Sequence, residues 1–405
     1  MSNTDNLTIH ELPAYWSLKL NEPNLYKKIV KLLPSINVIN NINPFPAQKN
    51  VRVTTESDTI VRPYRHFRSF YYPAQELNLD YKGYIALKGT EVFAENIDEL
   101  LKKIKAVHSI YSWSTRKSGL GLHNSDHALL PMADRYLFVE NKIPLLYLLS
   151  EAVEEVNAAV NLQKAYLDSY QTLARIPIPL AIYKIPEESL KAADSIFKNF
   201  YDEKRYKLVK NFMDEGIAIQ IYWYPNVPKR AAHIAFSTAA SNAGFQERIA
   251  YLSSIMDIEK CVENWILLFC RFLNLGFIPA DPIHACKGYC IDPGNLVLDG
   301  GMVDMGSIRH IDSFHYSGEI QFALENSIKL LIESIMALLI GKESMSYGFK
   351  SVFPDLSRLI YQNIEKNINI DSELGRFIHP YIKNWCYSKY NYKEIIEKLT
   401  NFFEL

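Results

Sequence analysis

The chain has 405 residues, of which 48% are hydrophobic and 22% are charged, and its formal net charge is −1. Such a composition is typical of a globular protein built as one two-lobed unit or as two to three domains. Because no net positive charge is present to attract nucleic acid or an acidic membrane surface, we expect neither as a partner.

Two further observations bear on the location of the protein. Residues 1–12 lack a basic stretch followed by an apolar run, and the longest apolar run, residues 330–340, is too short to cross a bilayer. We therefore expect a cytoplasmic protein. The five cysteines include no second closely spaced pair of metal ligands, so they predict buried or free thiols and not a zinc site or a disulfide framework.

Strands with two helices are predicted for the first half of the chain. Residues 84–88 read as an apolar strand that ends in Lys88, and residues 97–107 fit a helix. Apolar residues at helical spacing predict a long helix over residues 145–173. The almost wholly apolar residues 217–223 predict a strand that is buried in a sheet.

Two proline-containing segments follow the long predicted helix. Residues 175–183 begin with prolines and continue as a strand, whereas residues 224–230 form a stiff connector that we interpret as a hinge. Beyond the hinge the chain is predicted to be mainly helical, with helices at residues 258–275, 320–339, 356–366, 377–387 and 392–403.

This order of elements predicts an α+β fold with two lobes. The expected parts are an N-terminal extension (1–75), an N-lobe with a sheet and one long helix (76–225), and a helical C-lobe (226–405).

Residues 288–306 contain the pattern that most clearly indicates a functional site. A hairpin over residues 296–303 with a two-glycine turn would place Asn295 and Asp304 side by side at its open end. An amide oxygen and a carboxylate are hard oxygen ligands that suit Mg²⁺ bound to nucleotide phosphates, and Gly306 would permit the turn after the Asp. Kinase-like enzymes use an Asn and an Asp in this way. A plain hairpin without a ligand is the alternative interpretation.

Upstream features favour the metal-site interpretation. Lys88 ends an apolar strand, as a phosphate-binding lysine does, and Glu155 flanks the apolar face of the long predicted helix, as the acidic partner of that lysine would. A mostly apolar strand then leads into the hinge. The order of these features predicts a bilobal protein-kinase-like fold, with a β-rich N-lobe and a mainly helical C-lobe, that binds ATP and Mg²⁺.

A second phosphate-binding candidate lies in residues 116–123. Arg116 and Lys117 precede two glycines, and the backbone N–H groups of such a loop can cradle a phosphate. An ordinary surface loop has the same composition. The histidine pairs, His123 with His127 and His310 with His315, lack a third ligand nearby, so they predict ordinary histidines.

Short segments of the chain resemble the selenoprotein O pseudokinase family. Residues 85–89, Ile-Ala-Leu-Lys-Gly, look like that family's Lys-Gly strand. Asn295 with Asp304 nine residues later is similar to the family's Asn-Thr-Asp-Asn and Asp-Tyr-Gly motifs. The other similar patches are residues 174–181, 219–230 and 265–277.

The resemblance implies an enzyme that binds ATP in an inverted orientation and transfers AMP to a serine, threonine or tyrosine hydroxyl of a protein or peptide. It implies that Lys88 and either Lys229 or Arg230 bind phosphate, and that Asn295 and Asp304 bind the metal. ATP and Mg²⁺ are the cofactors that it implies.

The chain departs from the pattern of this family at several positions. Gly294 replaces the Asp before the metal-binding Asn, and the first arginine of the phosphate segment falls at Tyr222 or Trp223. Cys290 stands five residues before the Asn, where a protein kinase has its catalytic base. The nearest carboxylate that could accept a proton from an acceptor hydroxyl is Asp292.

The leading hypothesis is AMP transfer to a protein or peptide hydroxyl, with Asp292, Lys88 and Asp304 as catalytic residues. Two alternatives stay open. One is a kinase-like phosphotransferase that acts on a small molecule or a protein, and the other is a pseudokinase that binds nucleotide without catalysis.

Overall fold

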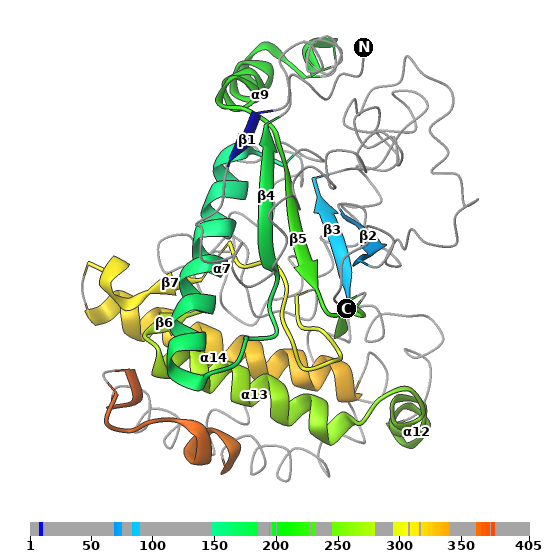
Figure 1. The fold of residues 1–405 in the computed structure, drawn as a ribbon, viewed down its shortest axis with the longest axis vertical. Coiled ribbons are helices and arrows are strands. Elements are labelled where there is room, and N and C mark those ends of the chain that lie inside the picture. The colour runs from blue at the N-terminus through cyan, green and yellow to red at the C-terminus, as the bar shows by residue number, and fades with distance from the viewer. Residues whose placement is uncertain are drawn as a thin grey trace. The chain divides into compact units, whose positions relative to one another are not determined.

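The computed structural model describes residues 8–10, 69–74, 83–89, 147–184, 194, 197–199, 201–226, 228–231, 245–279, 295–306, 308–315, 317–340, 362–372 and 374–376 (Figure 1). These residues form helices and small antiparallel sheets, so the chain has an α+β composition. None of the helices within these ranges is long and apolar enough to cross a membrane.

The described residues belong to two compact units. Unit 1 contains the main sheet, one short helix and the first part of a long helix as far as Asn157, and unit 2 contains the rest of that helix and everything described from Pro228 onward. The chain leaves unit 1 after Val227, two residues beyond the predicted lobe boundary. The long helix, which we predicted to lie wholly in the N-lobe, is divided between the units.

Within the described residues, the sheet of unit 1 has five antiparallel strands in the order β1-β4-β5-β3-β2. The strands are β1 (Thr8–His10), β2 (Ser69–Pro73), β3 (Tyr84–Lys88), β4 (Ile178–Lys184) and β5 (Ala218–Tyr224). The predicted strand at residues 84–88 is confirmed, and those at 175–183 and 217–223 are confirmed with small shifts of their ends. Residues 1–75, which we described as an extension, contribute two strands to this sheet.

The central position of β5 explains its composition. β5 pairs with β4 on one side and with β3 on the other, and all but one of its residues are buried. A strand enclosed in this way reads as a continuous apolar run, as the sequence predicts. Gln220 interrupts this apolar run with a polar side chain, and that side chain is fully buried.

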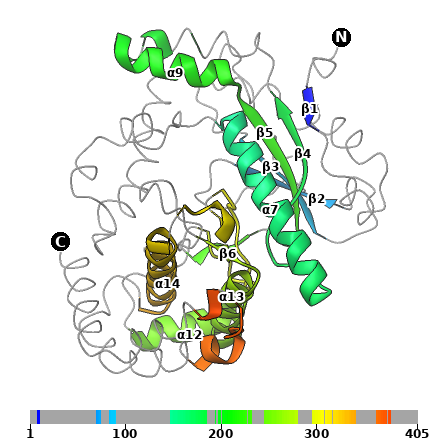
Figure 2. The same ribbon diagram turned by 90° about the vertical axis from the view of Figure 1, so that its left-hand side faces the viewer.

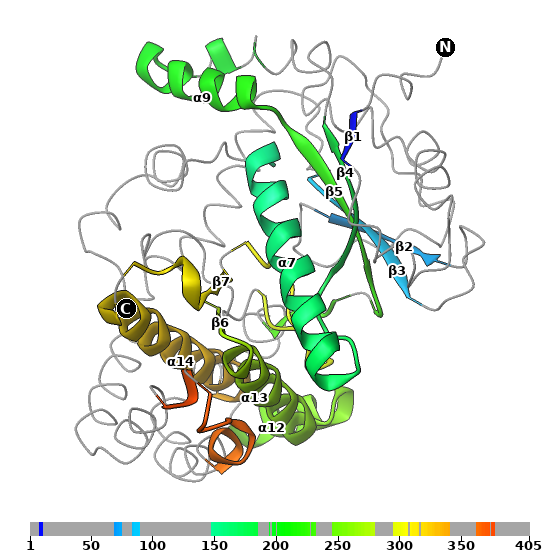
Figure 3. The same ribbon diagram turned by 60° about the vertical axis from the view of Figure 1, so that its left-hand side comes forward.

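Of the described helices, α7 and α9 accompany the strands of unit 1. α7 (Leu149–Tyr170) is the long predicted helix, and its first turns lie against one face of the sheet (Figure 3). α9 (Glu203–Glu215) begins at Asp202, whose carboxylate accepts a hydrogen bond from the backbone N–H of Arg205 at 2.9 Å. The sequence does not predict α9, because only Val209 and Met213 are buried and so sparse an apolar stripe is hard to recognise.

Unit 2 is mainly helical (Figure 2). Its helices are α12 (Phe245–Ile255), α13 (Ile258–Asn274) and α14 (Ser317–Ile340), and residues 362–367 are also helical. A two-stranded sheet pairs β6 (Phe277–Ile278) with β7 (Arg309–His310), and a 3-10 turn, η3 (Ile311–Ser313), follows β7. The helices predicted at residues 377–387 and 392–403, like that at 97–107, lie outside the described residues.

α13 is the best predicted helix of unit 2, because both of its ends carry recognisable signals. The Asp257 side chain accepts a hydrogen bond from Lys260 N at 2.9 Å at the N-terminus. Gly276 has a φ of 81° just after the C-terminus, and a Cβ there would lie 2.9 Å from His310 Nε2. Trp265 and Phe269 on the apolar face join the core that also includes residues of α7 and α14.

Cys261 and Cys270 lie on α13 as buried free thiols, which confirms the expectation for these two cysteines. Burial raises the pKa of Cys261 to about 12 and also raises the pKa of Cys270. We expect neither thiol to react with iodoacetamide in the native protein at pH 8, and both to react after unfolding in guanidinium chloride. Mass spectrometry of the labelled peptides measures this, and rapid native labelling of either thiol would contradict the packing of α13.

Candidate functional site

A buried ion pair joins the sheet of unit 1 to α7. Lys88 Nζ lies 2.5 Å from Glu155 Oε2, and the two side chains are only 8% and 3% exposed. The pairing that the sequence predicts is therefore confirmed, while the binding of a phosphate by this lysine stays a prediction. Lys88 is the last residue of β3, and Glu155 lies on the buried face of α7.

The side chain of Tyr147 contacts both members of this ion pair. Its hydroxyl lies 2.6 Å from the same Glu155 oxygen and 2.9 Å from the side-chain amide of Gln220, and the Lys88 ammonium lies 5.0 Å from the centre of its ring. Neither Tyr147 nor Gln220 is distinguished by its sequence context. Tyr147 is one of 26 tyrosines, and no local pattern distinguishes it from the others.

The hydroxyl of Tyr147 has one proton for two neighbours. The 2.6 Å distance and the charge of the carboxylate assign this proton to Glu155. In the structure the Gln220 atom at 2.9 Å is Oε1, which is an acceptor, and a turn of the amide by 180° would instead place Nε2 there as a donor to the hydroxyl. Lys88, Glu155, Tyr147 and Gln220 thus form one buried polar cluster, which we call the lysine cluster.

The predicted hairpin is present in unit 2. Leu296 bridges Met302, Val297 N donates to Gly301 O at 2.9 Å, and Val303 N donates to Asn295 O at 2.9 Å. The last of these bonds brings the backbones at the open end of the hairpin together. Asn295 and the residue before Asp304 are therefore paired at that end, while the metal site that Asn295 and Asp304 would form stays a prediction.

The turn of the hairpin depends on glycine and aspartate. Gly300 has a φ of 86°, and a Cβ there would lie 2.4 Å from Asn264 Cβ on α13, so a larger residue does not fit. The Asp299 carboxylate accepts a hydrogen bond from Gly301 N at 2.9 Å. The two-glycine turn is thus required by close packing on α13 as well as by the backbone conformation.

Neighbouring segments hold the hairpin on both sides. Ala231 N donates to Leu296 O at 2.9 Å and Leu298 N donates to Lys229 O at 2.8 Å, so the connector after β5 pairs with the first strand. Met302 N donates to Arg175 O at 2.9 Å on the other side. From α13, Trp265 Nε1 donates to Val297 O at 2.8 Å. These hydrogen bonds hold the backbone of the hairpin that carries Asn295 and Asp304.

Asp304 has an unusual backbone conformation, with a φ of 69°. A side chain at such a φ costs about 1–2 kcal/mol, and Asn and Asp tolerate it better than most residues. The chain turns at Gly306, as expected, and Ile308 N donates to Met305 O at 3.1 Å across this turn, but Gly306 does not have a positive φ. The left-handed residue is Asp304 itself, and strained residues of this kind concentrate at functional sites.

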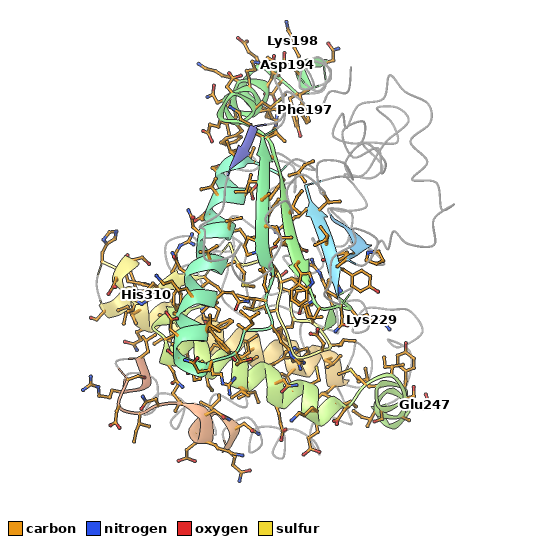
Figure 4. The ribbon with its side chains drawn as sticks, in the orientation of Figure 1. Asp194, Phe197, Lys198, Lys229, Glu247 and His310 are labelled. Carbon is orange, nitrogen blue, oxygen red and sulfur yellow. The ribbon has the colours of Figure 1, made fainter. Side chains whose placement is uncertain are left out.

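Arg230 and Lys229 point in different directions. Arg230 is 7% exposed, and its Nη1 lies 3.4 Å from Asn295 Oδ1. Lys229 is exposed, and its side chain points away from the ribbon (Figure 4). Successive residues of an extended segment face opposite sides, so of these two candidate phosphate-binding residues only Arg230 is buried beside Asn295.

The side chain of Arg309 stabilises the loop after Asp304. Its Nη1 donates to Gly306 O at 3.0 Å and to Ile308 O at 3.1 Å. The acidic neighbour Asp312 instead lies 3.1 Å from His310 Nδ1. No group of three or more His, Cys, Asp and Glu side chains that could hold a metal occurs in the part of the chain that the structure describes.

One departure from the resembled family has a structural explanation. Tyr222 is one of the two residues, with Trp223, at which the family's arginine would fall, and its hydroxyl lies 2.6 Å from that of Tyr71 across the buried Ala86 of β3. Tyr222 is 2% exposed. It is therefore a core residue of the sheet and does not substitute for a phosphate-binding arginine.

Several predicted site residues lie outside the described residues. They are Arg116, Lys117, Cys290, Asp292 and Gly294. No protein-family model, curated protein or solved structure matches the chain. Comparison with known proteins therefore assigns no role to these residues.

Proposed function

We propose that the chain is an ATP-dependent transferase of a bilobal protein-kinase-like fold that moves AMP to a hydroxyl of a protein or peptide. The buried Lys88–Glu155 ion pair carries this proposal. Burying both charges costs several kcal/mol per ion, and an apolar pair of similar volume would be as stable or more so. A lysine kept at that cost between a strand and a helix is suited to bind a phosphate.

The residues at the open end of the hairpin fit a magnesium ion. Asn295 and Asp304 offer an amide oxygen and a carboxylate, which are the oxygen ligands that Mg²⁺ prefers. Mg²⁺ held there would neutralise charge on the nucleotide phosphates. Arg230 lies 3.4 Å from Asn295, at the long limit of a hydrogen bond, so it can exchange this contact for a phosphate oxygen at little cost.

AMP transfer also fits the residues just before the hairpin, Cys290 and Asp292. In this reaction the acceptor oxygen bonds to the α-phosphorus of ATP, the bond from that phosphorus to the leaving pyrophosphate breaks, and a base takes the hydroxyl proton. Asp292 is the proposed base. Cys290 occupies the position of the kinase base, and a neutral thiol is a poor replacement for a carboxylate, which disfavours transfer of the γ-phosphoryl group.

Two labelled nucleotides test the proposal. We expect label from [α-³²P]ATP, and none from [γ-³²P]ATP, to become bound to an acceptor protein in a Mg²⁺-dependent manner, with release of pyrophosphate. Asp292→Asn should lower the rate of transfer about 100-fold with little effect on ATP binding, because it removes the base and keeps the size of the side chain.

Two outcomes would replace this proposal. Transfer of the γ-label together with production of ADP would identify a kinase. ATP binding without transfer of either label to a proteome of acceptors would favour the non-catalytic alternative.

A further inference from the structure

The backbone at the start of α7 places Tyr147 beside the sheet of unit 1. Ala218 N donates to Tyr147 O at 2.9 Å, Leu149 N donates to Gly216 O at 2.9 Å, and Leu148 bridges Ile217. These bonds continue the pairing of β5 up to the helix. Tyr147 is consequently 2% exposed and has a fixed position relative to β5.

The ring of Tyr147 occupies a space that Gly89 leaves open. A Cβ at Gly89 would lie 3.0 Å from Tyr147 Cβ, 3.2 Å from its Cδ1 and 2.6 Å from the carbonyl oxygen of Ala218. Gly89 also has a φ of 98°. The Lys-Gly sequence at the end of β3 therefore provides a lysine and, next to it, the room for a tyrosine.

Tyr147 contacts both members of the ion pair. Its hydroxyl donates to Glu155 Oε2, the oxygen that also accepts from Lys88, and the face of its ring lies 5.0 Å from the Lys88 ammonium. A cation over an aromatic face is attracted to the ring. One side chain thus orients the carboxylate through a hydrogen bond and supports the ammonium through its ring.

We propose that Tyr147 is a positioning residue that holds Lys88 in place for a phosphate oxygen of the nucleotide. This inference rests on the proposed function. Because the hydroxyl supplies one of the donors to Glu155 Oε2, the carboxylate is partly satisfied without the lysine. The Lys88 ammonium can then be shared between Glu155 and a phosphate, and its position is fixed before the nucleotide binds.

The test uses two tyrosine variants that lose the same kind of hydrogen bond. Tyr147→Phe keeps the ring and removes the hydroxyl. Tyr206→Phe is the matched control, because the Tyr206 hydroxyl on α9 lies 2.9 Å from the carboxylate of Asp194, away from the lysine cluster. A merely structural role predicts that both variants lose stability and that neither changes the reactivity of Lys88.

The first measurement does not involve the nucleotide. We expect acetic anhydride to acetylate Lys88 at least about threefold faster in Tyr147→Phe than in the wild type. The reason is that Glu155, which pairs with Lys88, loses the hydrogen bond from the tyrosine hydroxyl that orients it. Tyr206→Phe should show the wild-type rate. Mass spectrometry of the peptide that contains Lys88 gives these rates, and an unchanged rate in Tyr147→Phe would overturn the positioning role whether or not the protein binds ATP.

The second measurement is the KM for Mg²⁺-ATP in AMP transfer. We expect Tyr147→Phe to raise KM about tenfold and to lower kcat less, because a hydrogen bond to a charged group is lost and the phosphate contact of Lys88 weakens. Faster acetylation with an unchanged KM would overturn the link between Tyr147 and the phosphate. A wild-type protein that neither binds nor uses ATP would overturn the proposed function, while the acetylation rates would still decide the positioning role.

Discussion

Lys88→Met is expected to lower the free energy of unfolding by about 3–5 kcal/mol, because it leaves the Glu155 carboxylate buried without its cation. The double variant Lys88→Met/Glu155→Leu should recover most of this loss and be about as stable as the wild type. The Tyr147 hydroxyl can then donate to Gln220 Oε1, which lies 2.9 Å away, so removal of Glu155 leaves no unpaired hydroxyl proton. Urea denaturation of the four proteins of this double-mutant cycle measures the coupling.

The same double variant separates folding from function. It should fold and yet fail to bind Mg²⁺-ATP, since no ammonium remains for the phosphate. A double variant that binds Mg²⁺-ATP with wild-type affinity would show that the ion pair is only structural. Equal stability of the wild type and Lys88→Met would instead mean that the ion pair is not buried as described.

The elements that could be predicted from the sequence have strong local signals. β3, β5 and α13 combine dense apolar residues with clear ends, such as Asp257 before α13 and Gly276 after it. The hairpin was also predictable, because two glycines between short apolar runs allow few other conformations. α9 was not predictable, since only two of its residues are buried.

The details of the candidate site depend on contacts that a linear pattern does not contain. Gln220 joins the lysine cluster because β5 pairs with β3 and places it opposite Lys88. Tyr147 joins because the backbone around it pairs with residues 216–218, and its side chain contacts Gln220 although the two are 73 residues apart. The direction of Lys229 follows from the pairing of Arg230 with Val297. The left-handed conformation belongs to Asp304, although glycine is the usual residue for it and Gly306 stands nearby.

Asp304→Asn is expected to reduce the Mg²⁺-dependent affinity for ATP at least about 100-fold, because the change removes the negative charge of the only carboxylate that we assign to the metal. The substitution keeps the shape of the side chain. Asn also tolerates the φ of 69° at this position, so the free energy of unfolding should change by less than about 0.5 kcal/mol. Isothermal titration with ATP, with and without Mg²⁺, measures the effect.

Two further variants at this position separate backbone strain from metal binding. Asp304→Ala and Asp304→Gly both lack the carboxylate, so both should lose the Mg²⁺-dependent part of ATP binding. They should differ in stability, because a Cβ at a φ of 69° is strained and glycine is not, and Asp304→Gly should be about 1 kcal/mol more stable than Asp304→Ala. Wild-type Mg²⁺-dependent binding in all three variants would show that the metal site lies elsewhere. If the affinity for ATP falls in the order in which the variants lose stability, and does not depend on the loss of the negative charge, Asp304 serves only the fold of the hairpin.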